Sequence, residues 1–372
     1  MRVVFTGGGT GGHLYPALAI ARYLQKVYPK IQILFIGTAQ GLEAEIVPRA
    51  GFNFLTISSQ GLKRRFSWSN IKTGWLVLRG LRESRRILKQ FAPDLVVGTG
   101  GYVCGPVVLM AHWLGIPSAI HEQNAWPGIT NRILSRLVSL VMTTFEESKP
   151  HFTRAARVEV TGLPIRPEIM EVNRLAGAKS LNLNPQLLTI LVVGGSRGAQ
   201  SINRAMLTIL EHYQNRPDIQ IVQVTGTLGY EETRKSIIER GLDLEESGNI
   251  RVVPYLYDIE NALAVADLMI CRAGAATLAE ISAKGIPSVL IPYPYASENH
   301  QEHNARAFEA QGAAVVIKDR DLSGEKLLAA VQELLEEPGR LSRMAVAAHK
   351  LGRPQAVKEI VSLLSNYLQP VK

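Results

Sequence analysis

The chain has little cysteine. Its 372 residues include only Cys104 and Cys271, which lie far apart, each within an apolar segment. Such a pair does not form a disulfide framework, and both residues are expected to be buried thiols. Long apolar runs are also absent, because the most apolar window, residues 103–120, is interrupted by two prolines and a histidine. No secretory signal precedes the first strand-like residues, so the sequence predicts a cytoplasmic protein without a membrane-spanning helix.

Two nucleotide-binding patterns are incomplete or missing. Gly7, Gly9 and Gly12 have the G-x-G-x-x-G spacing of dinucleotide folds. However, the second predicted strand ends at Ile36-Gly37-Thr38, without the carboxylate that would bind a ribose. The phosphate loop G-x-x-x-x-G-K-S/T does not occur. Redox enzymes that use NAD or flavin, and ATPases with that phosphate loop, are therefore disfavoured.

Residues with metal-binding chemistry do not gather at the spacing of a metal site. His300 and His303 are three positions apart and have no third ligand nearby. Asp319 and Asp321 flank an arginine in a charged turn, where we expect both carboxylates to be solvated. The sequence therefore predicts no bound metal and no cofactor.

The stretch Thr6-Gly7-Gly8-Gly9-Thr10-Gly11-Gly12-His13 joins a predicted strand to a predicted helix that begins near Tyr15. Glycine permits positive φ and close approach of another molecule, and N–H groups at the start of a helix favour negative charge. We therefore expect an anion site here, with His13 at its edge. His13 could cap its helix or act as a general base, and Glu122, which follows a later strand, is the second candidate for the base.

Short apolar runs alternate with helical patterns, which predicts parallel sheets covered by helices on both faces. The pattern restarts after the Gly/Pro-rich segment 162–167, and a second glycine-rich turn, residues 194–199, again separates a strand from a helix. The expected fold class is α/β, with two tandem doubly wound (Rossmann-like) domains and a ligand cleft between them. The predicted strands are residues 2–6, 32–36, 54–57, 95–98, 118–120, 140–143, 158–160, 187–193, 219–225, 250–253, 268–270, 288–291 and 314–317.

Two further loops follow predicted strands. Residues 98–102, Gly-Thr-Gly-Gly-Tyr, would lie at the same edge of the first sheet as the opening loop, which favours a ligand-facing loop over a plain turn. Residues 272–280 open a helix with small side chains, so its first N–H groups are accessible to a diphosphate. Glu280, two turns into that helix, is either a solvated carboxylate or an acceptor for a ribose diol.

Positive charge is concentrated in the first half of the chain. Residues 1–165 hold 19 Lys and Arg against 8 Asp and Glu, whereas residues 166–372 hold 22 against 24. Residues 62–89 include nine basic residues, one acid and two tryptophans. Aromatic side chains beside arginines favour a helix on an anionic membrane, and a nucleic-acid patch is the alternative. The predicted membrane-binding residues are Arg64, Arg65, Trp68, Ile71, Lys72, Trp75, Arg79, Arg82 and Trp113.

Seven motifs occur in order along the chain: GGGTGGH-L-x-P-A, GTGGYVCGP, HEQNAWPG-x-TN, TG-L-P-I-R, GGSRGAQSIN, CRAGAATLAEI and NHQ-x-x-NA. Together they resemble the family of peptidoglycan N-acetylglucosaminyltransferases. The resemblance implies the glycosyltransferase B fold, with an acceptor and membrane-binding domain of residues 1–164 plus about 351–372, and a UDP-sugar-binding domain of residues 165–350. It implies inverting transfer of N-acetylglucosamine from UDP-N-acetylglucosamine to the C4 hydroxyl of undecaprenyl-diphospho-muramoyl-pentapeptide (lipid I), which gives lipid II.

The resemblance also implies roles for individual residues, while His13 and Glu122 remain the two catalytic candidates. Leu163, Arg197 and Glu298 depart from the family pattern, where asparagine, glutamine and aspartate are common. The implied substrate-binding residues are Thr10, Gly11 and Gly12 near the donor and the acceptor diphosphate, Asn124 and Gln301 at the sugar, Arg166 and Ser196 at the donor, Leu256 at uracil, Ala275, Ala276 and Thr277 at the diphosphate, and Glu280 at the ribose.

The implied location is the cytoplasmic face of the cell inner membrane, as a peripheral protein. The implied partners are UDP-N-acetylglucosamine, lipid I and an anionic membrane surface, with no nucleic acid. Three alternatives stay open: a UDP-N-acetylglucosamine 2-epimerase, a transferase acting on diacylglycerol, and a non-catalytic nucleotide-binding module. The basic aromatic stretch disfavours the first, and His13 with the complete donor set disfavours the third.

Overall fold

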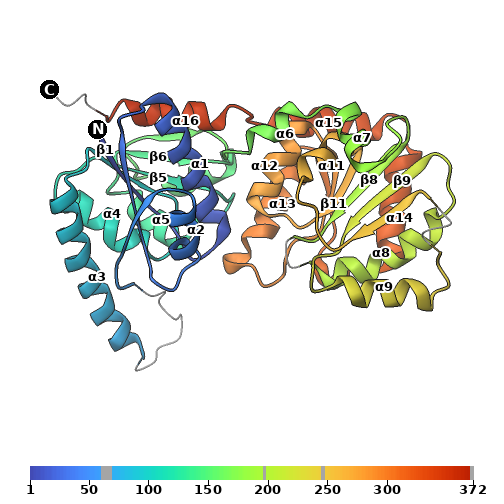
Figure 1. The fold of residues 1–372 in the computed structure, drawn as a ribbon, viewed down its shortest axis with the longest axis horizontal. Coiled ribbons are helices and arrows are strands. Elements are labelled where there is room, and N and C mark those ends of the chain that lie inside the picture. The colour runs from blue at the N-terminus through green and yellow to red at the C-terminus, as the bar shows by residue number, and fades with distance from the viewer. Residues whose placement is uncertain (60–68, 196–197, 244–247, 369–372) are drawn as a thin grey trace. The chain divides into compact units, whose positions relative to one another are not determined.

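The computed structural model describes residues 1–59, 69–195, 198–243 and 248–368, with backbone alone for residues 69–74. The chain divides into an N-terminal unit, residues 1–165 and 354–372, and a C-terminal unit, residues 166–353 (Figure 1). Both cysteines are buried, as predicted, and burial raises the pKa of each thiol to about 12. No helix in the described part of the chain has both the length and the apolar character of a membrane span.

In the described part of the N-terminal unit, seven parallel strands form one sheet in the order β3-β2-β1-β4-β5-β6-β7. Because the strand order changes direction at β1, the carboxyl ends of β1 and β4 are neighbours, with Thr6 opposite Gly98. A ligand commonly binds beside such a point in an open α/β sheet. The strands are β1 (Arg2–Thr6), β2 (Gln32–Gly37), β3 (Asn53–Thr56), β4 (Leu95–Gly98), β5 (Ser118–Glu122), β6 (Leu140–Thr143) and β7 (Val158–Val160).

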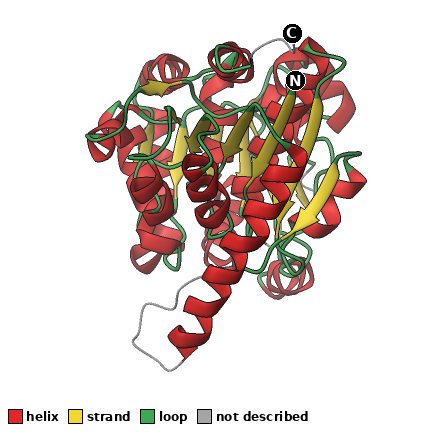
Figure 2. Cartoon of the chain, turned by 90° about the vertical axis from the view of Figure 1, so that its left-hand side faces the viewer, coloured by secondary structure: helices red, strands yellow, loops and turns green. Residues whose placement is uncertain are grey.

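Helices cover both faces of this sheet (Figure 2). Successive side chains of β1 point to opposite faces, so Val3 and Phe5 pack with residues of α1 and α16, whereas Val4 packs with residues of α3 and α4. Burial on both faces explains why the strands are continuously apolar. The helices are α1 (Gly11–Val27), α2 (Glu43–Arg49), α3 (Ser69–Phe91), α4 (Cys104–Trp113), α5 (Ile129–Leu134), the 3₁₀ helix η1 (Glu146–Phe152) and α16 (Ala356–Ser365).

The last helix, α16, belongs to the core of the N-terminal unit. Its residues Ile360 and Leu364 are fully buried in the same cluster as α1. The Tyr28 hydroxyl donates a hydrogen bond to Ser365 Oγ at 2.9 Å. The final segment of the chain therefore completes the first core.

In the described part of the C-terminal unit, six parallel strands have the order β10-β9-β8-β11-β12-β13. Here β8 and β11 are the central pair, with Val193 opposite Cys271. The strands are β8 (Leu188–Val193), β9 (Ile219–Val224), β10 (Ile250–Val253), β11 (Leu268–Cys271), β12 (Ser288–Leu290) and β13 (Ala314–Val316).

The helices of the C-terminal unit include α12, which follows the central strand β11. This helix begins after Gly274 and ends at Gly285, which adopts φ +68°. The helices are α6 (Pro167–Glu171), α7 (Arg174–Leu181), α8 (Gln200–Tyr213), α9 (Tyr230–Glu239), α11 (Ile259–Val265), α12 (Ala275–Lys284), α13 (His300–Ala310), α14 (Gly324–Glu336) and α15 (Arg340–Leu351), with the 3₁₀ helices η2 (Ser297–Asn299) and η3 (Asp319–Asp321).

Candidate active site

The opening glycine loop, between β1 and α1, is anchored by a carboxylate that sequence analysis did not identify. Glu43 is 1% exposed and accepts hydrogen bonds from Gly9 N at 3.1 Å and from Thr38 N and Oγ1 at 3.0 and 2.9 Å. A Cβ on Gly8 or Gly41 would lie 2.2–2.5 Å from this carboxylate, so only glycine leaves room for it. The Gly9 amide therefore donates to Glu43 and does not contribute to the expected anion site. The first N–H groups of α1 remain for that site.

Thr10, Gly11 and Gly12 form the start of α1. Thr10 is the N-cap residue, and its carbonyl oxygen accepts from His13 N and Leu14 N at 3.2 Å each. No described side chain caps this helix. The N–H groups of Gly11 and Gly12 are therefore at the positive end of the helix dipole, where the resemblance implies the acceptor diphosphate.

The second glycine loop, after β4, packs against the first. A Cβ on Gly7 would lie 2.0 Å from Thr99 Oγ1, and one on Gly101 would lie 2.4 Å from the Gly8 carbonyl oxygen. Gly100 has φ +104°, and a Cβ there would lie 2.8 Å from His13 Nδ1. The second loop therefore packs beside the His13 imidazole, and the two predicted loops meet at this histidine.

His13 is linked to the end of β5. Its Nδ1 lies 2.8 Å from Gln123 Oε1. An amide oxygen only accepts hydrogen bonds, so Nδ1 donates, and in the neutral imidazole Nε2 carries the lone pair. A nitrogen lone pair is the chemical requirement for a general base.

Glu122, the last residue of β5, organises the loop that follows it. Its side chain is 1% exposed. One carboxylate oxygen accepts from Asn124 N and Nδ2 at 3.0 and 3.3 Å, and the other accepts from Gly128 N at 3.1 Å and Asn131 Nδ2 at 2.8 Å. Four donors thus satisfy both oxygens, and the carboxylate places Asn124, which the resemblance assigns to the sugar.

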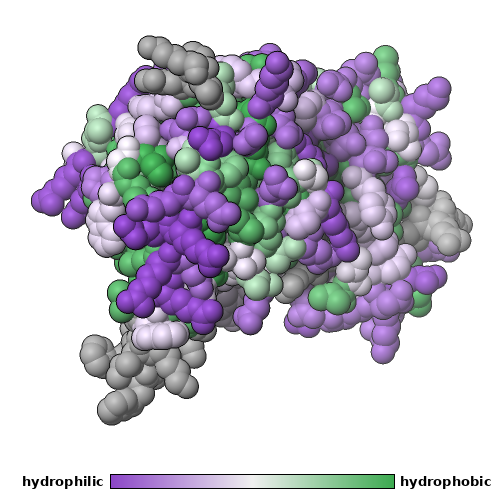
Figure 3. Space-filling view, turned by 60° about the vertical axis from the view of Figure 1, so that its left-hand side comes forward, coloured by the Kyte–Doolittle hydropathy of each residue, from purple (hydrophilic) through white to green (hydrophobic). Residues whose placement is uncertain are grey.

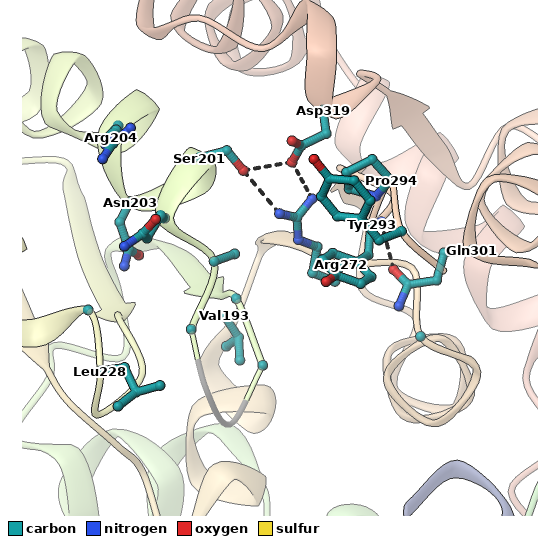
Figure 4. Close-up of a pocket in the computed structure, with 18 of the residues that line it drawn as sticks. Val193, Ser201, Asn203, Arg204, Leu228, Arg272, Tyr293, Pro294, Gln301 and Asp319 are labelled. Atoms are coloured by element: carbon teal, nitrogen blue, oxygen red, sulfur yellow. Dashed lines mark hydrogen bonds and ion pairs between the residues drawn. The ribbon is translucent and has the colours of Figure 1, made fainter. Parts of the chain in front are cut away.

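The C-terminal unit contains a cavity of about 700 Å³ at the carboxyl ends of β8 and β11 (Figure 4). Thr277 of α12 and Gln301 of α13 both line it, as do Gly194 and Gly195 of the glycine-rich turn. No described side chain caps α12. The N–H groups of its first residues, which include Ala275 and Ala276, therefore remain able to bind an anion.

Arg272 lies at this cavity and is held by Asp319 and Ser201 (Figure 4). Its Nη1 donates to Asp319 Oδ1 at 2.5 Å, its Nη2 donates to Ser201 Oγ at 3.0 Å, and Ser201 Oγ donates to the same carboxylate oxygen at 2.6 Å. The Arg272 and Asp319 side chains are only 13% and 19% exposed. The prediction of a solvated Asp319 is therefore wrong, because a guanidinium removed from water needs a charged partner.

Glu280 lies beside Arg166 within the same unit. Arg166 Nε is 3.7 Å from Glu280 Oε1, and Arg166 Nη1 is 3.5 Å from Glu260 Oε2. Burial raises the pKa of Glu280 to about 7, although Arg166 acts in the opposite direction. A largely buried carboxyl group that titrates near neutral pH does not fit a solvated helix residue.

Two other predicted donor-binding residues are Gln301, in the first turn of α13, and Leu256, on a loop. Gln301 Oε1 accepts a hydrogen bond from Tyr293 N at 3.0 Å, so its amide nitrogen is the group that can donate to a ligand. Leu256 lies between β10 and α11, flanked by the exposed Tyr255 and Tyr257, whose ring centroids are 4.9 Å apart. Leu256 is not among the described residues that line the cavity.

Both units match known family models. The model of the glycosyltransferase family 28 N-terminal domain matches residues 3–143, and that of the glycosyltransferase family 28 C-terminal domain matches residues 189–360. The chain belongs to glycosyltransferase family 28. The prediction of two tandem doubly wound domains of the glycosyltransferase B type is confirmed.

Two curated relatives are similar to this chain over nearly their full length. A Desulforamulus reducens protein is 52% identical over 99% of both chains, and a Desulfitobacterium hafniense protein is 54% identical over 98% of both. Each is named UDP-N-acetylglucosamine--N-acetylmuramyl-(pentapeptide) pyrophosphoryl-undecaprenol N-acetylglucosamine transferase.

Solved structures show the same architecture. The crystal structure of Acinetobacter baumannii MurG matches with a TM-score of 0.80 and 30% identity, over 98% of this chain and 99% of that one. A Neisseria meningitidis UDP-GlcNAc 2-epimerase, bound to UDP-GlcNAc, matches with a TM-score of 0.64 and 18% identity over 98% and 100% of the two chains. The second likeness concerns the fold alone.

In this family 28 chain, four predicted membrane-binding residues have described side chains. Trp75, Arg79 and Arg82 lie on the exposed side of α3, and Trp113 ends the neighbouring α4; the two tryptophans are 63% and 62% exposed. Figure 3 shows hydrophilic surface beside hydrophobic patches on this side of the N-terminal unit. The side chains of the other predicted membrane-binding residues lie outside the described part of the structure: Arg64, Arg65, Trp68, Ile71 and Lys72. Ser196, the substrate-binding candidate in the glycine-rich turn, also lies outside it.

Metal-binding side chains do not cluster in the part of the chain that the structure describes. Within these residues, no three His, Cys, Asp or Glu side chains lie together as a metal site would require. His300 Nδ1 instead lies 2.7 Å from the Ser297 carbonyl oxygen.

Proposed function

We propose that this chain transfers N-acetylglucosamine from UDP-N-acetylglucosamine to the C4 hydroxyl of lipid I, which produces lipid II and UDP. The observation that carries the proposal is the full-length likeness, at 52–54% identity, to relatives named for this transfer. The local chemistry supports it. The C-terminal unit has a cavity beside the N-terminus of α12, which no described side chain caps. The N-terminal unit presents a histidine whose Nδ1 faces an amide oxygen, so Nε2 carries the lone pair in the neutral ring.

The C-terminal unit is proposed to bind the donor. A departing UDP gains negative charge on its diphosphate. The N–H groups of Ala275, Ala276 and Thr277 are fixed donors that would stabilise this charge as it develops. Glu280 would accept hydrogen bonds from the ribose diol.

The N-terminal unit is proposed to bind the acceptor and supply the base. His13 Nε2 removes the proton of the C4 hydroxyl as this oxygen attacks the anomeric carbon of the donor. The bond from the anomeric carbon to the β-phosphate oxygen breaks, its electron pair leaves with UDP, and the configuration inverts. Glu122 has both oxygens engaged by four donors, so in this proposal it positions the loop that carries Asn124.

Conversion of lipid I by the purified protein tests the proposed reaction. With radiolabelled UDP-N-acetylglucosamine and lipid I in detergent or vesicles, we expect label in lipid II and release of one UDP per sugar. The same donor is incubated alone and with diacylglycerol. The manno epimer without acceptor, or product only on diacylglycerol, would contradict the proposal and would identify an epimerase or a different lipid glycosyltransferase.

The exposed side of α3 is proposed to bind an anionic membrane, which would place the protein peripherally on the cytoplasmic face of the inner membrane, where lipid I is located. This side combines the indole of Trp75 with the guanidinium groups of Arg79 and Arg82, and Glu83 pairs with Arg79 at 2.8 Å. An aromatic ring inserts between headgroups while basic side chains bind the lipid phosphates.

Replacing Trp75 and Arg82 together with alanine is expected to weaken binding to vesicles at least tenfold when they contain anionic lipid. One arginine contributes about 1 kcal/mol near an anionic surface, and the indole adds its buried apolar area. Cosedimentation with vesicles of increasing anionic fraction measures the change. Arg234→Ala/Arg240→Ala, which removes two exposed arginines at α9, is the matched control and should bind like the unaltered protein. Equal binding by both variants would exclude this surface.

A further inference from the structure

We propose that His121 and Gln123 are positioning residues that set the tautomer of His13, so that its Nε2 is the proton acceptor. The inference rests on the proposed function, because it concerns how the proposed base is prepared. It is carried by a continuous chain of hydrogen bonds that starts at the Gly162 carbonyl oxygen, passes through His121 and Gln123, and ends at His13. These four residues are called the relay below.

The relay starts at a main-chain carbonyl oxygen, which can only accept hydrogen bonds. The Gly162 carbonyl oxygen can only accept, and it lies 2.9 Å from His121 Nε2. His121 Nε2 must therefore donate, and in a neutral imidazole Nδ1 must then accept. The ring is fully buried, and burial lowers the pKa of His121 to about 4, so the ring is neutral at physiological pH.

The middle of the relay fixes the orientation of an amide. Gln123 Nε2 lies 3.1 Å from His121 Nδ1 and 2.9 Å from the His121 carbonyl oxygen, and both of these atoms are acceptors. The Gln123 side chain is 2% exposed, so water does not offer a substitute partner. A flipped amide would direct its oxygen at two acceptors, which is unfavourable in a buried site. Gln123 Oε1 therefore faces His13.

The end of the relay selects one form of the base. Because Gln123 Oε1 accepts, His13 Nδ1 donates, and the lone pair is on Nε2. Free imidazole side chains favour the opposite tautomer, with the hydrogen on Nε2, so a partner at Nδ1 is needed to reverse the preference. A Cβ on Gly100 would lie 2.8 Å from Nδ1, so only glycine at this position leaves room for the ring beside Gln123.

The placement follows from strand geometry. His121 lies in β5, and Gln123 directly follows Glu122, the last residue of that strand. Alternation along the strand separates Glu122 from His121, and the contact of Gln123 Nε2 with His121 Nδ1 places residues 121 and 123 on the same side. The end of this strand therefore supplies two hydrogen-bond networks, which meet at the His121 carbonyl oxygen, where both Gln123 Nε2 and Asn131 Nδ2 donate. Glu122 orders the loop that carries Asn124, while its two neighbours orient His13.

Nitrogen-15 NMR of the imidazole rings, recorded on the substrate-free full chain, tests the relay. Two-bond proton–nitrogen correlations distinguish the two tautomers, and His212 in the C-terminal unit is an internal reference. In the unaltered protein we expect His13 to carry its hydrogen on Nδ1. Gln123→Leu removes the acceptor, and we expect the hydrogen to move to Nε2 and kcat to fall at least tenfold, with KM for the donor within twofold.

The conservative variant Gln123→Glu keeps an acceptor oxygen opposite His13. We expect it to retain the hydrogen on Nδ1 and a kcat above that of Gln123→Leu. A hydrogen on Nε2 of His13 in the unaltered protein would overturn the relay, as would an unchanged tautomer and kcat in Gln123→Leu. If Gln123→Leu does not fold, the spectra of the unaltered protein and of Gln123→Glu still show which nitrogen of His13 carries the hydrogen.

The failure of the relay and the failure of the proposed function give different results. The spectrum needs no substrate. A His13 protonated on Nδ1 in a protein that forms no lipid II would support the relay and refute the proposed function. A His13 protonated on Nε2 in a protein that forms lipid II would refute the relay alone.

Discussion

Replacing His13 with alanine is expected to lower kcat for lipid II formation by about 10²- to 10⁴-fold, which is the range supplied by a positioned general base. UDP should bind with unchanged affinity, because the proposed donor-binding groups, which include Glu280 and the start of α12, belong to the C-terminal unit. Turnover is measured with radiolabelled UDP-N-acetylglucosamine and lipid I, and UDP affinity is measured by titration calorimetry.

A second histidine variant serves as the control for this experiment. His349 lies exposed near the end of α15, so His349→Ala should turn over like the unaltered protein. Turnover of His13→Ala within threefold of that control would remove His13 as the base. The role would then return to Glu122, although its oxygens already accept four hydrogen bonds.

The order of strands and helices could be predicted because each buried strand is a short, continuous apolar run. Residues 2–6 were expected as a strand and form β1, whose side chains are buried on both faces of the sheet from Val3 onward. The glycine loops were found for a related reason. Each follows such a run directly, and parallel strands bring their carboxyl ends to one edge.

The contacts that hold the loops could not be predicted, because they join residues distant in sequence. Glu43 is 34 positions from Gly9 and looks like any carboxylate in the first turn of a helix. Its only sequence signal is the set of glycines that leave room for it, such as Gly8 and Gly41, and their meaning depends on the packing.

The contact of Asp319 could not be predicted for the same reason. Its partner Arg272 is 47 positions away, and the charged turn that carries it resembles a solvated one when read alone. Gln123 stands within a motif that was recognised, HEQN, yet its amide has a role only because His121 and His13 lie on either side of it. Local pattern thus identified where the site is, and tertiary packing determined which atoms face one another.

Glu280 is expected to make the C-terminal unit less stable as pH rises. Burial raises the pKa of its carboxyl group from 4.5 to about 7, so the folded state retains a proton that the unfolded state has released between these values. Its contribution to stability is fully present below pH 4.5 and is lost as pH rises through 7. At about 1.4 kcal/mol per pKa unit, the effect reaches at most about 3 kcal/mol. The pKa of His121 is lowered from 6.5 to about 4, so His121 makes the protein more stable as pH rises between these two values.

Glu280→Gln is therefore expected to increase the free energy of unfolding at pH 8 by up to about 3 kcal/mol relative to the unaltered protein, with little difference at pH 4.5. Comparing the two proteins cancels the contribution of His121, which both contain.

The same variant should bind UDP about tenfold more weakly, because the ribose diol loses a charged acceptor. A residue that lowers stability while it serves ligand binding is common at functional sites. Urea unfolding at both pH values and titration calorimetry measure these changes. Glu171→Gln, at an exposed carboxylate that ends α6, should leave both unfolding curves unaltered. Equal shifts of Glu280→Gln at pH 4.5 and pH 8 would show that Glu280 does not titrate between them, and would contradict the role of its burial.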